Sequence, residues 1–225
     1  MTTTTVLRDP MPLPQVERNS CQSCVTAQAR WMLGLSDLTG QDAVREMDRL
    51  TGRQPGAGIP VSFSVPVLLE DGCEVVCYGP PDIDRDRLHR EGLSYFREYY
   101  SREWTADDES YWTEERLAAF AERSEAERAT KAAAEQRFGW RLGRGPEFTI
   151  RHAESLLAGG WLILTTYVED HGPGTSHATL VYGRDGSAFS LYTPRYREPG
   201  LEEASWQTFA GMVRPYAVAA RVADR

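Results

Sequence analysis

The chain has 225 residues, a formal net charge of −8 and an apolar fraction of 41%, which is enough for one sizeable hydrophobic core. An acidic chain without a stripe of Lys and Arg is a poor candidate for nucleic-acid binding, because neutralising phosphates needs clustered cations. No apolar run approaches the roughly 20 residues of a membrane-spanning helix, and the first residues do not read as a secretory signal. We therefore expect a cytoplasmic protein that acts without a membrane. Lys131 is the only lysine among many arginines, a composition that suggests a GC-rich bacterial genome.

The first third of the chain is predicted to be helical. Residues 1–14 carry three prolines and are expected to form a flexible arm. A helix should begin near Ser20, a good capping residue, and end at about Leu33. Residues 41–50 place apolar side chains at helical spacing and predict a second, amphipathic helix.

The middle of the chain predicts a helix, a strand and then a long insert. Residues 62–72 read as a short apolar helix, and residues 73–79 read as a strand rich in valine. Residues 84–140 form a polar helical insert rich in Arg, Glu and Ala. The aromatic residues of its first half are expected to dock on the core, and its second half to form a solvated helix or a mobile arm.

The last third is predicted to be rich in strands. Helices are expected at residues 148–160 and 202–213, and strands at 161–168, 178–183, 188–193 and 216–222. Helices first and an antiparallel sheet later are typical of the α+β class. We expect one domain over residues 15–225.

Two side chains form the simplest set for acyl-transfer chemistry. Cys21 would lie in the first turn of the predicted helix, where unpaired backbone N–H groups and the helix dipole favour a thiolate. His177 opens a strand after a Gly-Pro-Gly loop and would supply the base. Cys24, one turn further along the helix, is the alternative nucleophile. Each cysteine also has the simpler interpretation of a small buried hydrophobe, and His177 that of a hydrogen-bonded strand end. His171, in the loop, is a weaker candidate.

The four cysteines also suggest a zinc site, with one pair in a helix and Cys73 and Cys77 in a strand. Four residues of a strand span roughly 13 Å, too far for two ligands of one ion. We therefore expect no metal and no cofactor.

The order of these signals resembles the papain-like cysteine peptidases of the bacteriocin-processing type. In that family a Gln is followed by five residues and then by the catalytic Cys, and Gln15 and Cys21 have this spacing. CQSCVTAQARWMLG resembles the helix that the catalytic Cys opens, and SHATLVYGRDGSAFSLYTP resembles the hairpin of the catalytic His. The resemblance covers residues 12–80 and 146–222. It implies a papain-like fold with an N-terminal helical lobe and a C-terminal antiparallel sheet, with residues 84–140 as an insert.

Carried over by position, the resemblance implies a role for each of four residues. Cys21 would be the nucleophile, His177 the general base and Gln15 a donor to the oxyanion. Thr193 stands where the family has the Asp or Asn that orients the histidine. The alternative register, in which CQSCV matches the Cys-Gly-Ser-Cys-Trp of papain, makes Cys24 reactive but places Arg18 at the position of the Gln; we therefore prefer Cys21.

The implied function is cysteine-dependent acyl transfer in bacterial peptide or natural-product metabolism. The enzyme would be a peptidase or amidase, or else an acyltransferase or amide ligase, forming an acyl-thioester on Cys21. Its partner would be a peptide, amide or thioester substrate, free or held on a carrier protein. Thr193 cannot stabilise an imidazolium as a carboxylate does, and Gln22 replaces a usual glycine. The alternative is therefore a catalytically degenerate protein that binds or regulates.

Overall fold

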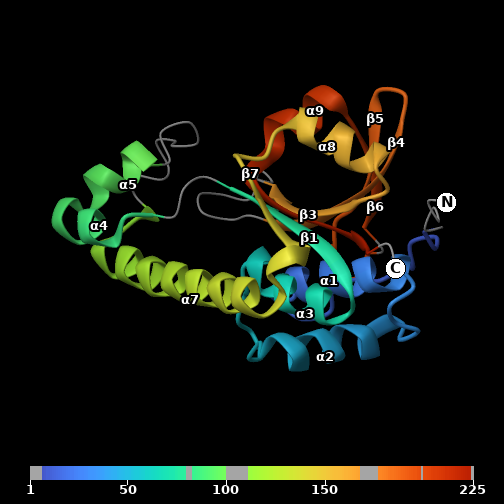
Figure 1. The fold of residues 1–225 in the computed structure, drawn as a ribbon, viewed down its shortest axis with the longest axis horizontal. Coiled ribbons are helices and arrows are strands. Elements are labelled where there is room, and N and C mark those ends of the chain that lie inside the picture. Colours follow the sequence, from blue (N-terminus) through green and yellow to red (C-terminus); the bar gives the residue numbers. More distant parts are fainter. Residues whose placement is uncertain (1–6, 80–82, 100–110, 168–176, 199, 224–225) are drawn as a thin grey trace.

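The described residues are built on one mixed seven-stranded sheet, which is covered by helices on both faces (Figure 1). The computed structural model describes residues 7–79, 83–99, 111–167, 177–198 and 200–223. The helices are α1 (Cys21–Met32), α2 (Gly40–Thr51), α3 (Ser64–Glu70), α4 (Arg85–Glu91), α5 (Leu93–Tyr99), α7 (Glu114–Phe138), α8 (Ile150–Ala158) and α9 (Trp206–Met212). The strands are β1 (Cys73–Tyr78), β2 (Leu142–Gly145), β3 (Leu162–Tyr167), β4 (His177–Asp185), β5 (Ala188–Tyr192), β6 (Leu201–Ser205) and β7 (Val213–Val222).

The strand order is β2-β1-β7-β3-β4-β5-β6. The pairs are antiparallel except for β1 with β2, which run parallel at one edge. The helices of the first third lie on one face of the sheet, and α8 and α9 lie on the other (Figure 1). The predicted α+β class, with a helical lobe followed by a largely antiparallel sheet, is confirmed.

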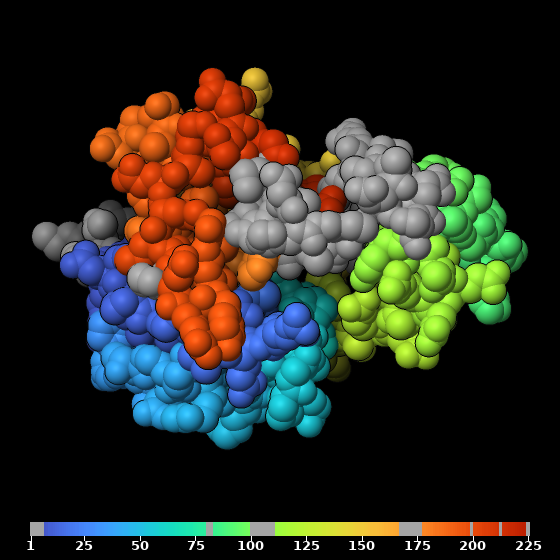
Figure 2. Space-filling model, turned by 180° about the vertical axis from the view of Figure 1, so that it is seen from behind, coloured from blue at the N-terminus to red at the C-terminus, as the bar shows by residue number. Residues whose placement is uncertain are grey.

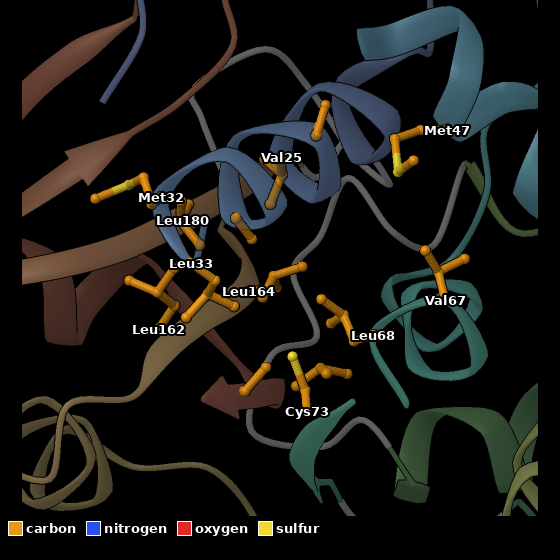
Figure 3. Close-up of a cluster of buried hydrophobic side chains, with 14 of the residues drawn as sticks. Val25, Met32, Leu33, Met47, Val67, Leu68, Cys73, Leu162, Leu164 and Leu180 are labelled. Carbon is orange, nitrogen blue, oxygen red and sulfur yellow. The ribbon is translucent and has the colours of Figure 1, made fainter. Parts of the chain in front are cut away.

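The main core lies between α1, α3 and the central strands. Figure 3 shows Val25 of α1 and Leu68 of α3 facing Leu164 and Leu180 of the sheet, and all four are fully buried. Because α1 is covered on nearly all sides, its polar side chains must pair within the protein. Gln22 Nε2 donates to the hydroxyl of Ser64 at 2.8 Å, which satisfies one of these buried groups.

The insert forms an arm that extends away from the sheet. Helix α7 packs on α3 through its last turns, and α4 and α5 lie at its far end (Figure 1). The ring of Phe96 meets those of Trp112 and Phe120 at centroid distances of 4.6 and 4.9 Å. The prediction that these aromatic residues dock on the main core is wrong, because they form a separate small core within the arm. The second half of the insert is a largely solvated helix, as one of the two predicted alternatives has it.

Two further expectations are corrected by the structure, and one strand is added. Residues 7–14 are not a flexible arm, since Met11 and Leu13 are buried and the Leu13 carbonyl accepts a hydrogen bond from the Tyr192 hydroxyl at 2.6 Å. The predicted helix at residues 202–213 begins only at Trp206, because the preceding residues form the edge strand β6. Strand β2 was not expected at all.

Candidate active site

The loop that precedes α1 is held by hydrogen bonds from its side chains to backbone carbonyl groups. The carbonyl of Glu17 accepts hydrogen bonds from Gln15 Nε2 at 2.8 Å and from the Ser20 hydroxyl at 2.9 Å. Asn19 adopts a left-handed backbone conformation with φ of 62°, and its side-chain amide donates to the carbonyl of Gly56 at 2.8 Å. Asn tolerates this conformation better than most residues do. The chain therefore enters the helix at a defined angle, with Cys21 as the first helical residue.

A buried arginine ties this loop to the end of α2. The Arg53 side chain is 1% exposed and forms a bidentate ion pair with Asp48 at 2.6 and 2.7 Å. It also donates to the carboxylate of Glu17 at 2.8 Å and to the carbonyl of Ala57 at 3.0 Å. These carboxylates raise the pKa of Arg53 further. No spacing in the sequence indicated this cluster, because Arg53 and Glu17 lie 36 positions apart.

Cys21 lies where α1 meets the start of β4. Its partly exposed thiol contacts the backbone amide of Ala178, which favours the thiolate together with the amides of Gln22 and of Cys21 itself. Burial outweighs these donors and raises the pKa of the Cys21 thiol above its ordinary value. The backbone N–H groups at the helix start favour the thiolate, as expected, but they do not offset the effect of burial on the pKa. A base beside the thiol would therefore help it to act as a nucleophile.

His177 is the first residue of β4 and directly precedes the amide that contacts the thiol. Its side chain is partly exposed, with the Nδ1 atom shielded from solvent. His177 and Cys21 line the same cleft. The structure thus brings together the predicted nucleophile and base, which are 156 positions apart in the sequence. His171, the weaker candidate, lies outside the described residues.

Cys24 occupies a different environment from Cys21. It is fully buried, its sulfur lies 3.9 Å from the Ser20 hydroxyl, and burial raises its pKa to about 12. It belongs to the main core beneath the helix, whereas Cys21 faces the cleft. The preference for Cys21 over Cys24 as the candidate nucleophile stays a prediction.

Gln15 lines the same cleft as Cys21 and is 6% exposed. Its backbone N–H donates to the carbonyl of Arg195 at 3.0 Å, and its carbonyl accepts from the N–H of Arg197 at 3.0 Å. These two bonds join the N-terminal segment to the connection between β5 and β6. The side-chain nitrogen already donates to Glu17, but an amide group carries a second N–H.

Thr193 follows β5 and is fully buried. Its hydroxyl hydrogen-bonds to that of Thr179 at 2.8 Å, and the Thr179 hydroxyl donates to the carbonyl of Tyr192 at 3.1 Å. Continuing the register of β4 with β5 places Thr193 opposite Thr179, which lies on the same face of β4 as His177. The role of Thr193 in orienting the imidazole stays a prediction.

The cleft in front of Cys21 has a volume of about 2740 Å³ and lies between the body and the arm. Figure 2 shows the arm, in green, as a bulge at one end of the molecule. The floor is formed by sheet residues such as Ala178 and Val218, and α7 supplies the opposite wall. Within the described residues, no group of three or more His, Cys, Asp or Glu side chains has the arrangement of a metal site.

Comparisons with known proteins are sparse. No family model and no curated protein matches the chain. Among solved structures, the peptidase domain of Streptococcus ComA, a bifunctional ABC transporter involved in a quorum-sensing pathway, is similar with 12% identity and a TM-score of 0.45. The match covers 93% of this chain and 96% of that domain. In the part of the chain that the structure describes, no helix has the length and apolarity to cross a membrane.

Proposed function

We propose that this chain is a papain-like cysteine enzyme that accepts the acyl group of a peptide, amide or thioester on Cys21. One observation carries the proposal. The Cys21 thiol, at the start of α1, contacts the Ala178 amide next to His177, at the wall of a large cleft. A thiol, an imidazole and backbone N–H groups at one open site are the elements that acyl transfer needs.

The reaction begins with proton transfer. Because burial disfavours the Cys21 thiolate, His177 takes the proton of the thiol as the sulfur attacks the carbonyl carbon. The oxyanion that forms receives hydrogen bonds from the second N–H of Gln15 Nε2 and from a backbone N–H near Cys21. The imidazolium then protonates the leaving group as the carbon–heteroatom bond breaks, which leaves an acyl-thioester and neutral His177. Attack by water or by an amine, deprotonated by His177, releases the acyl group and restores the thiol.

The residue at position 193 affects whether water or an amine attacks the acyl-thioester. A hydroxyl in place of a carboxylate stabilises the imidazolium less, which slows each step that passes through it. A slower attack by water lengthens the life of the thioester and gives a bound amine more time to react. The proposal therefore includes an acyltransferase or ligase as well as a peptidase. A cytoplasmic enzyme of bacterial peptide or natural-product metabolism, taking its acyl group from a carrier protein in some cases, fits this chemistry.

The test is acylation by p-nitrophenyl acetate, followed by intact-protein mass and peptide mapping. We expect an acetyl group on Cys21, its absence in Cys21→Ala, and a rate at least about 100-fold lower in His177→Ala. Cys24→Ala, the matched control in the same helix, should acylate at the wild-type rate. Equal, slow modification of all four cysteines would refute the enzyme and favour the alternative of a binding protein on this scaffold.

A further inference from the structure

The cleft differs in charge from the rest of the protein. Among the described residues its lining includes eight Lys and Arg and six Asp and Glu, whereas the described residues together have 23 and 25. The described lining therefore carries a small excess of positive charge, whereas the described residues as a whole carry a small excess of negative charge. Such a charge distribution concentrates anions in a cleft and repels them elsewhere.

Much of the excess lies on the body wall beside Cys21. There the cleft is lined by Arg18, Arg195, Arg214 and Glu198, and Arg195 also pairs with Glu202 at 3.0 Å. Arg18 is exposed and, among the residues that the structure describes, makes no ion pair. The carboxylate of the preceding residue, Glu17, is held by Arg53 and is not free to neutralise it.

The arm contributes five cations and five acidic side chains to the described lining. Lys131 is partly buried on α7 and lines the cleft. Its charge is near enough to the sheet to favour the thiolate of Cys77 in β1. Over the described ranges of the chain Lys131 forms no ion pair, although Glu127 lies four positions before it on the same wall. A partly desolvated ammonium without a carboxylate is stabilised by an anion that enters the cleft.

We propose that this cleft selects acidic peptides, with Arg18 on the body wall and Lys131 on the arm wall as residues that determine specificity. The proposal deepens the function proposed above and rests on it, since the peptide would present its carbonyl to Cys21 while its Asp or Glu side chains meet the two cations. The peptide would lie between the arm and the sheet.

Two alkylating reagents measure the charge preference without a known substrate. Iodoacetate and iodoacetamide both lose iodide to the Cys21 thiolate, but only iodoacetate is an anion. The ratio of their rates at Cys21, read by peptide mapping, is independent of the fraction of thiolate. We expect this ratio to exceed that of N-acetylcysteinamide and to fall about twofold in Arg18→Gln and in Lys131→Gln, as the loss of one screened charge predicts. Arg151→Gln, an exposed arginine of α8 outside the cleft, changes the net charge equally and should leave the ratio unchanged.

Protection by peptides completes the test. Acetyl-Glu-Glu-Ala-Glu-Glu-amide should slow the alkylation of Cys21 by iodoacetamide more than its Gln counterpart does, and Lys131→Gln should reduce the difference. A ratio no higher than that of the model thiol, or equal protection by the two peptides, would overturn the proposal. Failure of the enzyme reading is seen separately, because Cys21 would then resist acylation by p-nitrophenyl acetate while the alkylation ratio kept its value.

Discussion

Gly200 gives the sharpest test of the backbone around Thr193. Its φ is +67°, and a Cβ atom at this position would lie 1.9 Å from the carbonyl oxygen of Thr193 and 2.7 Å from its carbonyl carbon. Both atoms belong to the backbone, so no side-chain rotation relieves the contact. The amide of Thr193 also donates to the Gly200 carbonyl at 2.8 Å, so the two strands are held together at this point.

The expected loss in Gly200→Ala has two parts. A non-glycine residue in the left-handed region costs about 1 kcal/mol. The overlap forces the backbone apart and weakens the hydrogen bond of Thr193, which adds about 2 kcal/mol. Gly186→Ala is the matched control, since Gly186 has a φ of +56° in the β4–β5 turn but no atom within 4 Å of its Cβ position. It should lose about 1 kcal/mol only.

Urea unfolding of both variants measures the difference. The midpoint for Gly200→Ala should fall well below that for Gly186→Ala at an unchanged slope, corresponding to a gap of about 2 kcal/mol. Acylation of Cys21 should slow in Gly200→Ala alone, because Thr193 is displaced. Equal stabilities of the two variants would refute the reasoning, since the clash would then not exist in the folded protein.

Three further predictions concern buried groups. Arg53→Met should lower the free energy of unfolding by about 3 kcal/mol and slow acylation, because it leaves the Glu17 carboxylate without its partner and loosens the loop before α1. Raising the pH should destabilise the fold, because burial raises the pKa of Cys24 from 9.0 to about 12, so that only the unfolded chain ionises this thiol between those values. At about pH 10 this one group lowers the free energy of unfolding by about 1.4 kcal/mol. Thr193→Val should cost about 1 kcal/mol through its bond with Thr179 and reduce the acylation rate.

Each of these has a control and a result that contradicts it. Arg45→Met removes an exposed ion pair of α2 and should lower the free energy of unfolding by under about 1 kcal/mol. A loss as small as this in Arg53→Met would contradict the prediction that burial makes the ion pairs of Arg53 important for stability. Cys24→Val should lose less stability than the wild type when urea unfolding is repeated at high pH; an equal loss would assign the effect to other groups. Thr193→Ser keeps the hydroxyl and should acylate normally. A wild-type rate in Thr193→Val would place the orienting group elsewhere.

Much of the fold could be predicted from the spacing of apolar residues, because the buried side chains recur with the period of a helix or of a strand. Residues 73–79, with two valines in a row, form β1, and α2 follows the helical spacing of its apolar residues. Strand β6 escaped prediction because Leu201–Ser205 is an edge strand with two adjacent glutamates, a composition that favours a helix. The burial of Leu13 is a tertiary effect that three nearby prolines conceal.

The candidate site could be predicted only where a residue type restricts the chemistry. Cys21 and His177 stood out because few side chains act as nucleophile or base. Their electrostatics could not be predicted, because the pKa of Cys21 depends on how deeply α1 lies against the sheet. Arg53 carries no signal either, since its function arises from two carboxylates that only the folded chain brings together.

The bonds between Gln15 and the segment around Arg195 and Arg197 have a consequence for the order of events during synthesis. The hydroxyl of Tyr192 likewise bonds to a carbonyl 179 positions earlier. Contacts of such sequence separation close late in folding, after local helices have formed. A nascent chain that still lacks its last third can form α1, but it has neither β4 to supply His177 nor the partner that fixes Gln15. The nucleophile segment is therefore made well before its base, and the two can meet only after His177 and the rest of β4 have been synthesised.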